Sequence, residues 1–207
     1  MAGVNTADLE GVPTMDSNGN FYFVSDRNYA STFSTLYQGR YNNGTVSNVQ
    51  ILQGVSKLQA GWVNFDIEAS ADGQFIYFVD ARFDQSGNPN SADLVIAEKK
   101  PNGFQRLPNT ADLFKNLNTN ALEYAACISN NQLEIYFTRV AVPLTSNSTP
   151  EIYYATRKDI AEPFGSPKKT PNISGFVEAA TIAQDQKTLY FHKKENNKFV
   201  LYLIKKN

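Results

Sequence analysis

One segment recurs four times along this chain, and this repetition constrains the fold more than any other feature. Each copy holds an acidic residue, a short apolar run, a turn rich in Asn, Asp, Gly or Gln, and an adjacent Tyr-Phe pair. The second aromatic residues of the pairs are at positions 23, 78, 137 and 191, so the spacings are 55, 59 and 54 residues. A period of this length predicts a repeat architecture in which each copy folds as one antiparallel sheet.

Each copy predicts strands in the same order. The first strand follows the acidic residue, and we expect it at 12–15, 67–71, 124–129 and 179–183. The second strand carries the aromatic pair, at 21–25, 75–80, 134–139 and 188–193. The third is expected at 35–39, 93–98, 151–157 and 199–204, and the fourth at 46–52, 104–107 and 167–170. The last copy ends before a fourth strand, so we expect residues 1–4 to pair beside its third strand and close a ring, which would cover an open sheet edge.

The aromatic pairs indicate how the sheets pack. Adjacent residues of a strand point to opposite faces, so each pair places a ring on both sides of its sheet. Sheets packed on both faces by neighbouring sheets are typical of a β-propeller. We therefore predict an all-β, single-domain propeller over 1–207, with four blade-like repeats at about 1–53, 54–108, 109–170 and 171–207. A single β-sandwich is the alternative, and the repeat period argues against it. The one helical pattern is at 110–117, with Thr110 as its N-cap.

Two motifs carry a resemblance to a known family. They are the strand that ends in Ala155-Thr156-Arg157 followed by Glu162-Pro163-Phe164-Gly165, and the segment Phe23-Val24-Ser25-Asp26-Arg27. Together with the repeated hairpins, they resemble the TolB-type, WD40-like β-propeller repeats of bacterial proteins. The resemblance implies a propeller that acts as a binding platform in an exported protein, either periplasmic or secreted. Of the family's Ser-Pro-Asp-Gly turn, only Ala71-Asp72-Gly73 remains.

Composition excludes several function classes. Lys and Arg number 19 against 20 Asp and Glu, with no basic stripe, so we do not expect nucleic acid as a partner. The apolar runs are too short to span a membrane, and the first residues, Met1-Ala2-Gly3-Val4, lack the pattern of a signal peptide. The single cysteine, Cys127, is expected to be a small buried apolar residue. We expect a monomer.

The acidic residues of the four copies form the main candidate site. If the copies are blades, Glu10, Asp66, Glu123 and Glu178 begin the innermost strands and ring one mouth of the central channel. Such a ring could hold Ca²⁺ or a cationic group, although no other cofactor is expected. The alternative is structural. Hairpin registers place Glu10 opposite Arg27, Glu123 opposite Arg139 and Glu178 opposite Lys193, whereas Arg82 falls opposite Val63.

Other candidate binding residues are expected on the same face, near the loops that join the second and third strands. Trp62 could stack on a sugar or anchor a peptide, or could be wedged between blades. Arg27, Arg82 and Arg139 could bind a carboxylate or a phosphate. His192 is the sole histidine, which leaves one candidate general base and excludes multi-histidine metal sites.

Three functions remain open from the sequence. It favours a non-enzymatic propeller that binds a protein, peptide or glycan on the face with the acidic ring. The second is a carbohydrate-active hydrolase or lyase that uses the channel-mouth carboxylates. The third is a scaffold repeat from a larger exported protein, whose open edge would be the partner surface.

Overall fold

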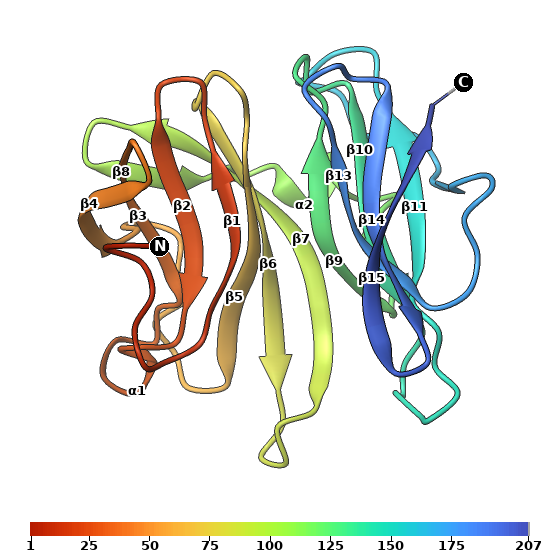
Figure 1. Cartoon of the computed structure of the whole chain (residues 1–207), viewed down its shortest axis with the longest axis horizontal. Helices are drawn as coiled ribbons and strands as arrows, with labels where there is room; N and C mark the ends of the chain where they lie inside the picture. Colours follow the sequence, from red (N-terminus) through yellow and green to blue (C-terminus); the bar gives the residue numbers. More distant parts are fainter. Residues whose placement is uncertain (207) are drawn as a thin grey trace.

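The computed structural model describes residues 1–206, which fold as an all-β chain with two one-turn helices (Figure 1). Its strands form four units that follow the predicted repeats. Unit 1 contains β1 (Glu10–Met15), β2 (Asn20–Ser25), β3 (Leu36–Asn42) and β4 (Thr45–Ile51). Unit 2 contains β5 (Trp62–Ala69), β6 (Phe75–Phe83), β7 (Pro89–Lys100) and β8 (Gly103–Arg106). Unit 3 contains β9 (Leu122–Ile128), β10 (Glu134–Val140), β11 (Glu151–Thr156) and β12 (Lys168–Lys169), and unit 4 contains β13 (Val177–Ile182), β14 (Thr188–Glu195) and β15 (Lys198–Lys205).

Within each unit the strands pair antiparallel in chain order. Units 2 and 3 are also joined into one eight-stranded sheet by a single parallel pair, Ala92 with Leu122. The first strands of the units lie side by side in a row, with β1 against β5, β5 against β9 and β9 against β13. Figure 1 looks into the opening between the two ends of this row, with β1 and β2 on one side and β13 to β15 on the other. In residues 1–206 the sheets therefore do not close into a ring.

The aromatic pairs hold the units together, as the sequence predicts. Tyr77 packs between units 2 and 3, while its neighbour Phe78 packs between units 1 and 2. Phe137 and Tyr136 divide in the same way between the two faces of unit 3. These rings are at most 4% exposed, and burial of each contributes about 2 to 3 kcal/mol. The last pair differs, because Tyr190 is 37% exposed on the face of unit 4 that has no neighbour.

The N-terminal segment does not complete unit 4, contrary to our expectation. Ala2 instead forms a parallel bridge with Thr45 in unit 1, and Val46 donates its N–H to the Ala2 carbonyl at 3.0 Å. Val4 is buried against Phe21 and Phe23. The outer face of unit 1 carries aromatic rings that need a cover, so the segment stabilises unit 1 and leaves β15 as an edge strand.

The predicted helix is shorter than expected. α2 covers Thr110–Leu113, while α1 is a single turn at Tyr29–Thr32. Asn109 is the N-cap of α2, and the Thr110 hydroxyl instead donates to the Leu107 carbonyl at 2.8 Å. The apolar residues predicted for one helical face, Leu113, Phe114 and Leu117, are all buried in the core between units 2 and 3. None of the helices in residues 1–206 is long and apolar enough to cross a membrane.

Candidate functional site

A β-bulge lies in the middle of every innermost strand. The register of each first hairpin shifts by one residue between positions 11 and 14, 65 and 68, 124 and 127, and 178 and 181. The first bulged residue has positive φ in each unit: Val12, Asp66, Ala125 and Ala179, at 50°, 51°, 50° and 55°. A bulge redirects side chains and increases local twist. Because all four units share the bulge, it is a regular feature of the repeat. Among the four bulged residues, only Asp66 has an acidic side chain.

The bulges show that the four predicted acids are not equivalent. Counted from the bulge, Glu10 and Glu123 correspond to Asn64 and Val177, whereas Asp66 lies two positions further along its strand. The one-residue shift also places Glu178 opposite His192 instead of Lys193, and Arg82 opposite Trp62 instead of Val63. The predicted pairing of Glu178 with Lys193 is therefore wrong.

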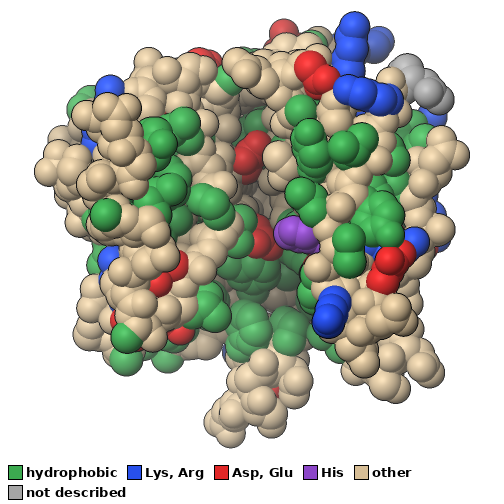
Figure 2. Space-filling model, in the orientation of Figure 1, with side chains coloured by type: hydrophobic (Ala, Val, Ile, Leu, Met, Phe, Trp, Pro, Cys, Tyr) green, Lys and Arg blue, Asp and Glu red, His purple; other side chains and the backbone are tan. Residues whose placement is uncertain are grey.

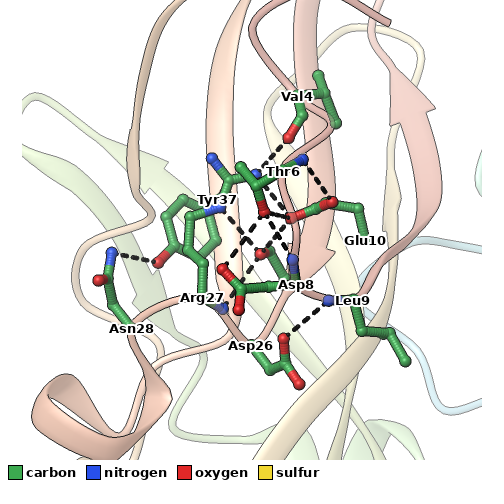
Figure 3. Close-up of polar contacts among 10 residues, drawn as sticks. Val4, Thr6, Asp8, Leu9, Glu10, Asp26, Arg27, Asn28 and Tyr37 are labelled. Atoms are coloured by element: carbon green, nitrogen blue, oxygen red, sulfur yellow. Dashed lines mark hydrogen bonds and ion pairs between the residues drawn. The ribbon is translucent and has the colours of Figure 1, made fainter.

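Glu10 and Glu123 have the same structural role in units 1 and 3. Thr6 donates both its N–H and its hydroxyl to the Glu10 carboxylate, at 3.0 and 2.7 Å (Figure 3). These hydrogen bonds lower the pKa of Glu10 to about 2. Arg27 contacts the same carboxylate at 3.2 Å, although Ser25 and not Arg27 lies directly opposite Glu10 in the sheet. Glu10 is therefore held as a fixed anion that ties the N-terminal loop to unit 1.

Unit 3 repeats this arrangement nearly atom for atom. Thr119 donates its N–H and hydroxyl to Glu123 at 3.0 and 2.7 Å, and Arg139 Nε contacts Glu123 at 2.7 Å. Arg139 lies opposite Glu123, as predicted. The guanidinium groups of Arg139 and Arg27 also lie over aromatic rings of their own units, 4.8 Å from Tyr153 and 5.0 Å from Tyr37. In both units, the carboxylate is thus held by hydrogen bonds from a threonine and by an ion pair with an arginine of the same unit.

Asp66 and Glu178 have a different environment. Figure 2 shows acidic side chains inside the hollow between the two ends of the row, with the histidine at its edge. The Asp66 carboxylate accepts the Ala125 N–H at 3.0 Å, and no cation contacts it among residues 1–206. Burial, together with the nearby charge of Glu178, raises the pKa of Asp66 from 3.8 to about 7. Asp66 is therefore an acid that can hold or release its proton at neutral pH.

Tyr124 orients Glu178. The Tyr124 hydroxyl donates to Glu178 Oε2 at 2.9 Å, and burial with the adjacent Glu178 carboxylate raises the tyrosine pKa, so the hydroxyl keeps its proton. His192 is directly opposite Glu178 in the antiparallel pair, which places both side chains on one face of unit 4. Asp66, Tyr124 and Glu178 thus meet from three different units, with His192 beside Glu178.

Glu68 is a further buried carboxyl of β5 that we did not predict as a site residue from the sequence. Thr14 donates to Glu68 Oε2 at 2.9 Å, and burial raises the pKa of Glu68 to about 7. The Cys127 thiol lies beside it and accepts the Ile182 N–H at 3.1 Å, and burial raises the thiol pKa well above its usual range. The signal for Glu68 was a second acidic residue in the same strand, two positions after Asp66. Tyr124 gave no such signal, because an aromatic residue in a strand is ordinary.

The remaining candidates lie elsewhere. Trp62 begins β5, with Lys57 Nζ 3.3 Å from its ring centroid and Arg82 at 6.0 Å. Its carbonyl accepts the Tyr29 hydroxyl at 2.9 Å, so Trp62 ties units 1 and 2 together. In residues 1–206 no cluster of three or more His, Cys, Asp or Glu is placed to hold a metal ion. The four acids do not meet as a ring, and we propose no calcium site.

Comparisons with known proteins bear on the fold. No protein-family model matches the sequence, and no curated protein matches it. An exo-1,5-α-L-arabinanase from a bovine ruminal metagenomic library is similar in structure, with a TM-score of 0.55 and 13% identity over 95% of this chain and 73% of the arabinanase. A Trypanosoma rangeli sialidase in complex with the inhibitor DANA has a TM-score of 0.51 and 13% identity over 96% of this chain and 37% of the sialidase.

A Mycobacterium tuberculosis puromycin-hydrolyzing peptidase is also similar, with a TM-score of 0.52 and 12% identity over 97% of this chain and 29% of the peptidase. The chain therefore spans well under half of the sialidase and the peptidase. At such identities, the likeness shows a shared fold alone, and the arabinanase and the sialidase are β-propellers. This chain has a propeller-like all-β fold. One fold that carries several activities leaves function to be argued from the site.

Proposed function

We propose that the chain is a carbohydrate-active hydrolase that cleaves a glycosidic bond in the hollow, with Asp66 as the general acid and Glu178 as the second carboxylate. We further propose that the four units are four propeller blades. The observation that supports the activity most strongly is the uncompensated carboxyl of Asp66 near the oriented carboxylate of Glu178. The non-enzymatic binding module that the sequence favoured has less support, because it gives no reason for this arrangement.

The chemistry needs two carboxyl groups in different protonation states. Glycosidases use one protonated carboxyl to donate to the leaving oxygen and one carboxylate to activate water or to attack the sugar. Burial keeps Asp66 protonated up to about neutral pH, as a donor must be. Glu178, held by Tyr124, provides the second group. Glu10 and Glu123 have no catalytic part in this proposal, since each is enclosed by its own threonine and arginine.

Hydrolysis of a glycoside panel tests the proposal. The panel would pair each oligosaccharide with the 4-nitrophenyl glycoside of the same sugar, using arabinosyl, xylosyl, galactosyl and sialyl substrates. For the substrate that is cleaved, D66N should lose roughly 10²–10⁴-fold in kcat on the oligosaccharide. The loss should be much smaller on the nitrophenyl glycoside, whose leaving group needs no proton. E178Q should lose activity on both.

The control variant is E162Q, which neutralises an exposed carboxylate in the loop between β11 and β12 and should leave turnover unchanged. Circular dichroism would show that each variant is folded. Equal activity of D66N and the unmodified protein on the oligosaccharide would refute the assigned role. A complete lack of turnover on the panel would argue for the binding module.

A second candidate function is favoured by the outer face of unit 4. Phe199, Leu201 and Leu203 are 53%, 63% and 54% exposed, and β15 pairs only with β14, whereas the third strands of the other units each pair with a fourth strand. An apolar face beside an open edge is the kind of surface through which a scaffold unit joins a larger assembly. Light scattering of the unmodified chain and of a variant with L201K and L203K tests this. Association that the double variant abolishes would support the scaffold, and a monomer at high concentration would argue against it.

A further inference from the structure

An apolar pocket lies between units 2 and 3, beside the carboxyl groups. Its volume is about 330 Å³. The walls come from β5 and β9, from the end of β6, the start of β7 and the end of β10, from the loop between β10 and β11, and from the segment just before β13. Its wall residues include Phe65, Phe83, Leu122, Tyr124, Leu144 and Phe176.

The lining indicates the chemistry of a ligand. Carbon atoms form nearly all of the wall, and the side chains that offer polar atoms are Tyr124, Thr145 and Ser148. Thr145 and Ser148 already hydrogen-bond within their loop, where Ser148 Oγ accepts the Thr145 N–H at 2.8 Å. A sugar ring buried here would leave its hydroxyl groups without partners, which is costly. The pocket therefore suits an aryl or branched aliphatic group, and its size matches that of small-molecule sites.

Tyr124 connects this pocket to the carboxyl groups. Its ring forms part of the pocket wall, and its hydroxyl donates to Glu178 at 2.9 Å. Phe65 and Phe176 also line the pocket. Phe65 immediately precedes Asp66, and Phe176 comes two residues before Glu178. A ligand whose apolar part fills the pocket would thus place its adjoining part near Asp66 and Glu178.

We propose that this pocket binds an aryl group, and that this group is the apolar end of the molecule whose glycosidic bond is cleaved in the hollow. The second half of the proposal rests on the proposed hydrolase function, whereas binding of the aryl group does not. The preferred substrates are accordingly aryl glycosides and sugars that carry an aromatic substituent, and unmodified oligosaccharides should bind more weakly.

Calorimetric titration with 2-naphthol tests the pocket directly. Leu144 lines the pocket and is 46% exposed, so L144D places a carboxylate in the wall without disturbing the core. We expect the unmodified protein to bind 2-naphthol and L144D to bind it at least tenfold more weakly. L144F, which keeps an apolar wall, should bind within about threefold of the unmodified protein. The matched control is L58D, which makes the same change at a loop leucine that is 65% exposed and outside the pocket.

The outcomes separate the pocket from the hydrolase. D66N and E178Q should retain binding of 2-naphthol even if no glycoside is turned over, in which case the pocket stands and the hydrolase fails. If turnover is found but a naphthyl glycoside and the methyl glycoside of the same sugar have equal KM, the pocket has no part in substrate binding and the proposal is wrong. Failure of 2-naphthol to bind, or equal loss in L144D and L58D, would also overturn it.

Discussion

Replacing Asp66 with Asn should change how the stability of the protein depends on pH. The pKa of Asp66 is raised from 3.8 to about 7, so between these values the folded state holds a proton that the unfolded chain releases. The free energy of unfolding therefore falls as pH rises through this window. At about 1.4 kcal/mol for each pH unit, the full effect is about 4 kcal/mol, of which about 3 kcal/mol falls between pH 4.5 and pH 8.

Asn is a close substitute at this position. Its side-chain oxygen can accept the Ala125 N–H, and Asn tolerates the φ of 51° better than most residues. D66N should thus exceed the unmodified protein by about 1 kcal/mol at pH 4.5 and by about 4 kcal/mol at pH 8. Urea denaturation followed by circular dichroism would measure the difference at pH 8 as a rise of about 1 to 2 M in the midpoint. The E162Q control should have the same free energy of unfolding as the unmodified protein at both pH values. If the difference between D66N and the unmodified protein is the same at pH 4.5 and at pH 8, the reasoning is refuted.

Two further predictions concern the buried polar groups. R139A should lower the free energy of unfolding, measured in urea, by about 3 to 5 kcal/mol, because the fully buried carboxylate of Glu123 would lose its cation. R27A should lower it by less, because the Glu10 carboxylate is partly exposed. Equal losses in the two variants would show that burial does not distinguish the two pairs. Cys127 is 3% exposed with a raised pKa, so iodoacetamide at pH 8 should modify it only as the protein unfolds, and rapid alkylation of the folded protein would contradict the assigned burial.

The sequence was sufficient to predict the all-β repeat architecture. Adjacent aromatic residues in each second strand required packing on both faces, and Tyr77 with Phe78 and Tyr136 with Phe137 confirm it. The strand order of each unit followed from the turns. The bacterial family resemblance and the exported location stay predictions, since nothing in the structure bears on them.

The registers beyond the bulges of units 2 and 4, in contrast, could not be predicted because of the bulges. A bulge adds one residue to one strand, and a one-residue shift exchanges which side chains are opposite one another. Three of the four bulged residues are Val12, Ala125 and Ala179, which ordinarily avoid positive φ, so the sequence carries no sign of the irregularity. This is why Asp66 was aligned with Glu10 and Glu123, which are structural, and why Glu178 was paired with Lys193.

The predicted position of the N-terminal segment, beside β15, was wrong for a different reason. Pairing beside β15 and packing on unit 1 both bury apolar residues, and the choice depends on which face most needs a cover. Val4 packs on Phe21 and Phe23, whose aromatic surface would otherwise face water. Such a competition between two surfaces is decided by three-dimensional shape, which the repeat pattern does not contain.

The pH profile of kcat/KM on a cleaved oligosaccharide tests the central claim most directly, namely that Asp66 donates the proton in the hollow. If it does, the rate should fall tenfold per pH unit above a midpoint near 7, where Asp66 loses its proton. In D66N this alkaline fall should disappear along with most of the activity. A rate that stays level from pH 6 to pH 9, or an alkaline fall that persists unchanged in D66N, would contradict the account.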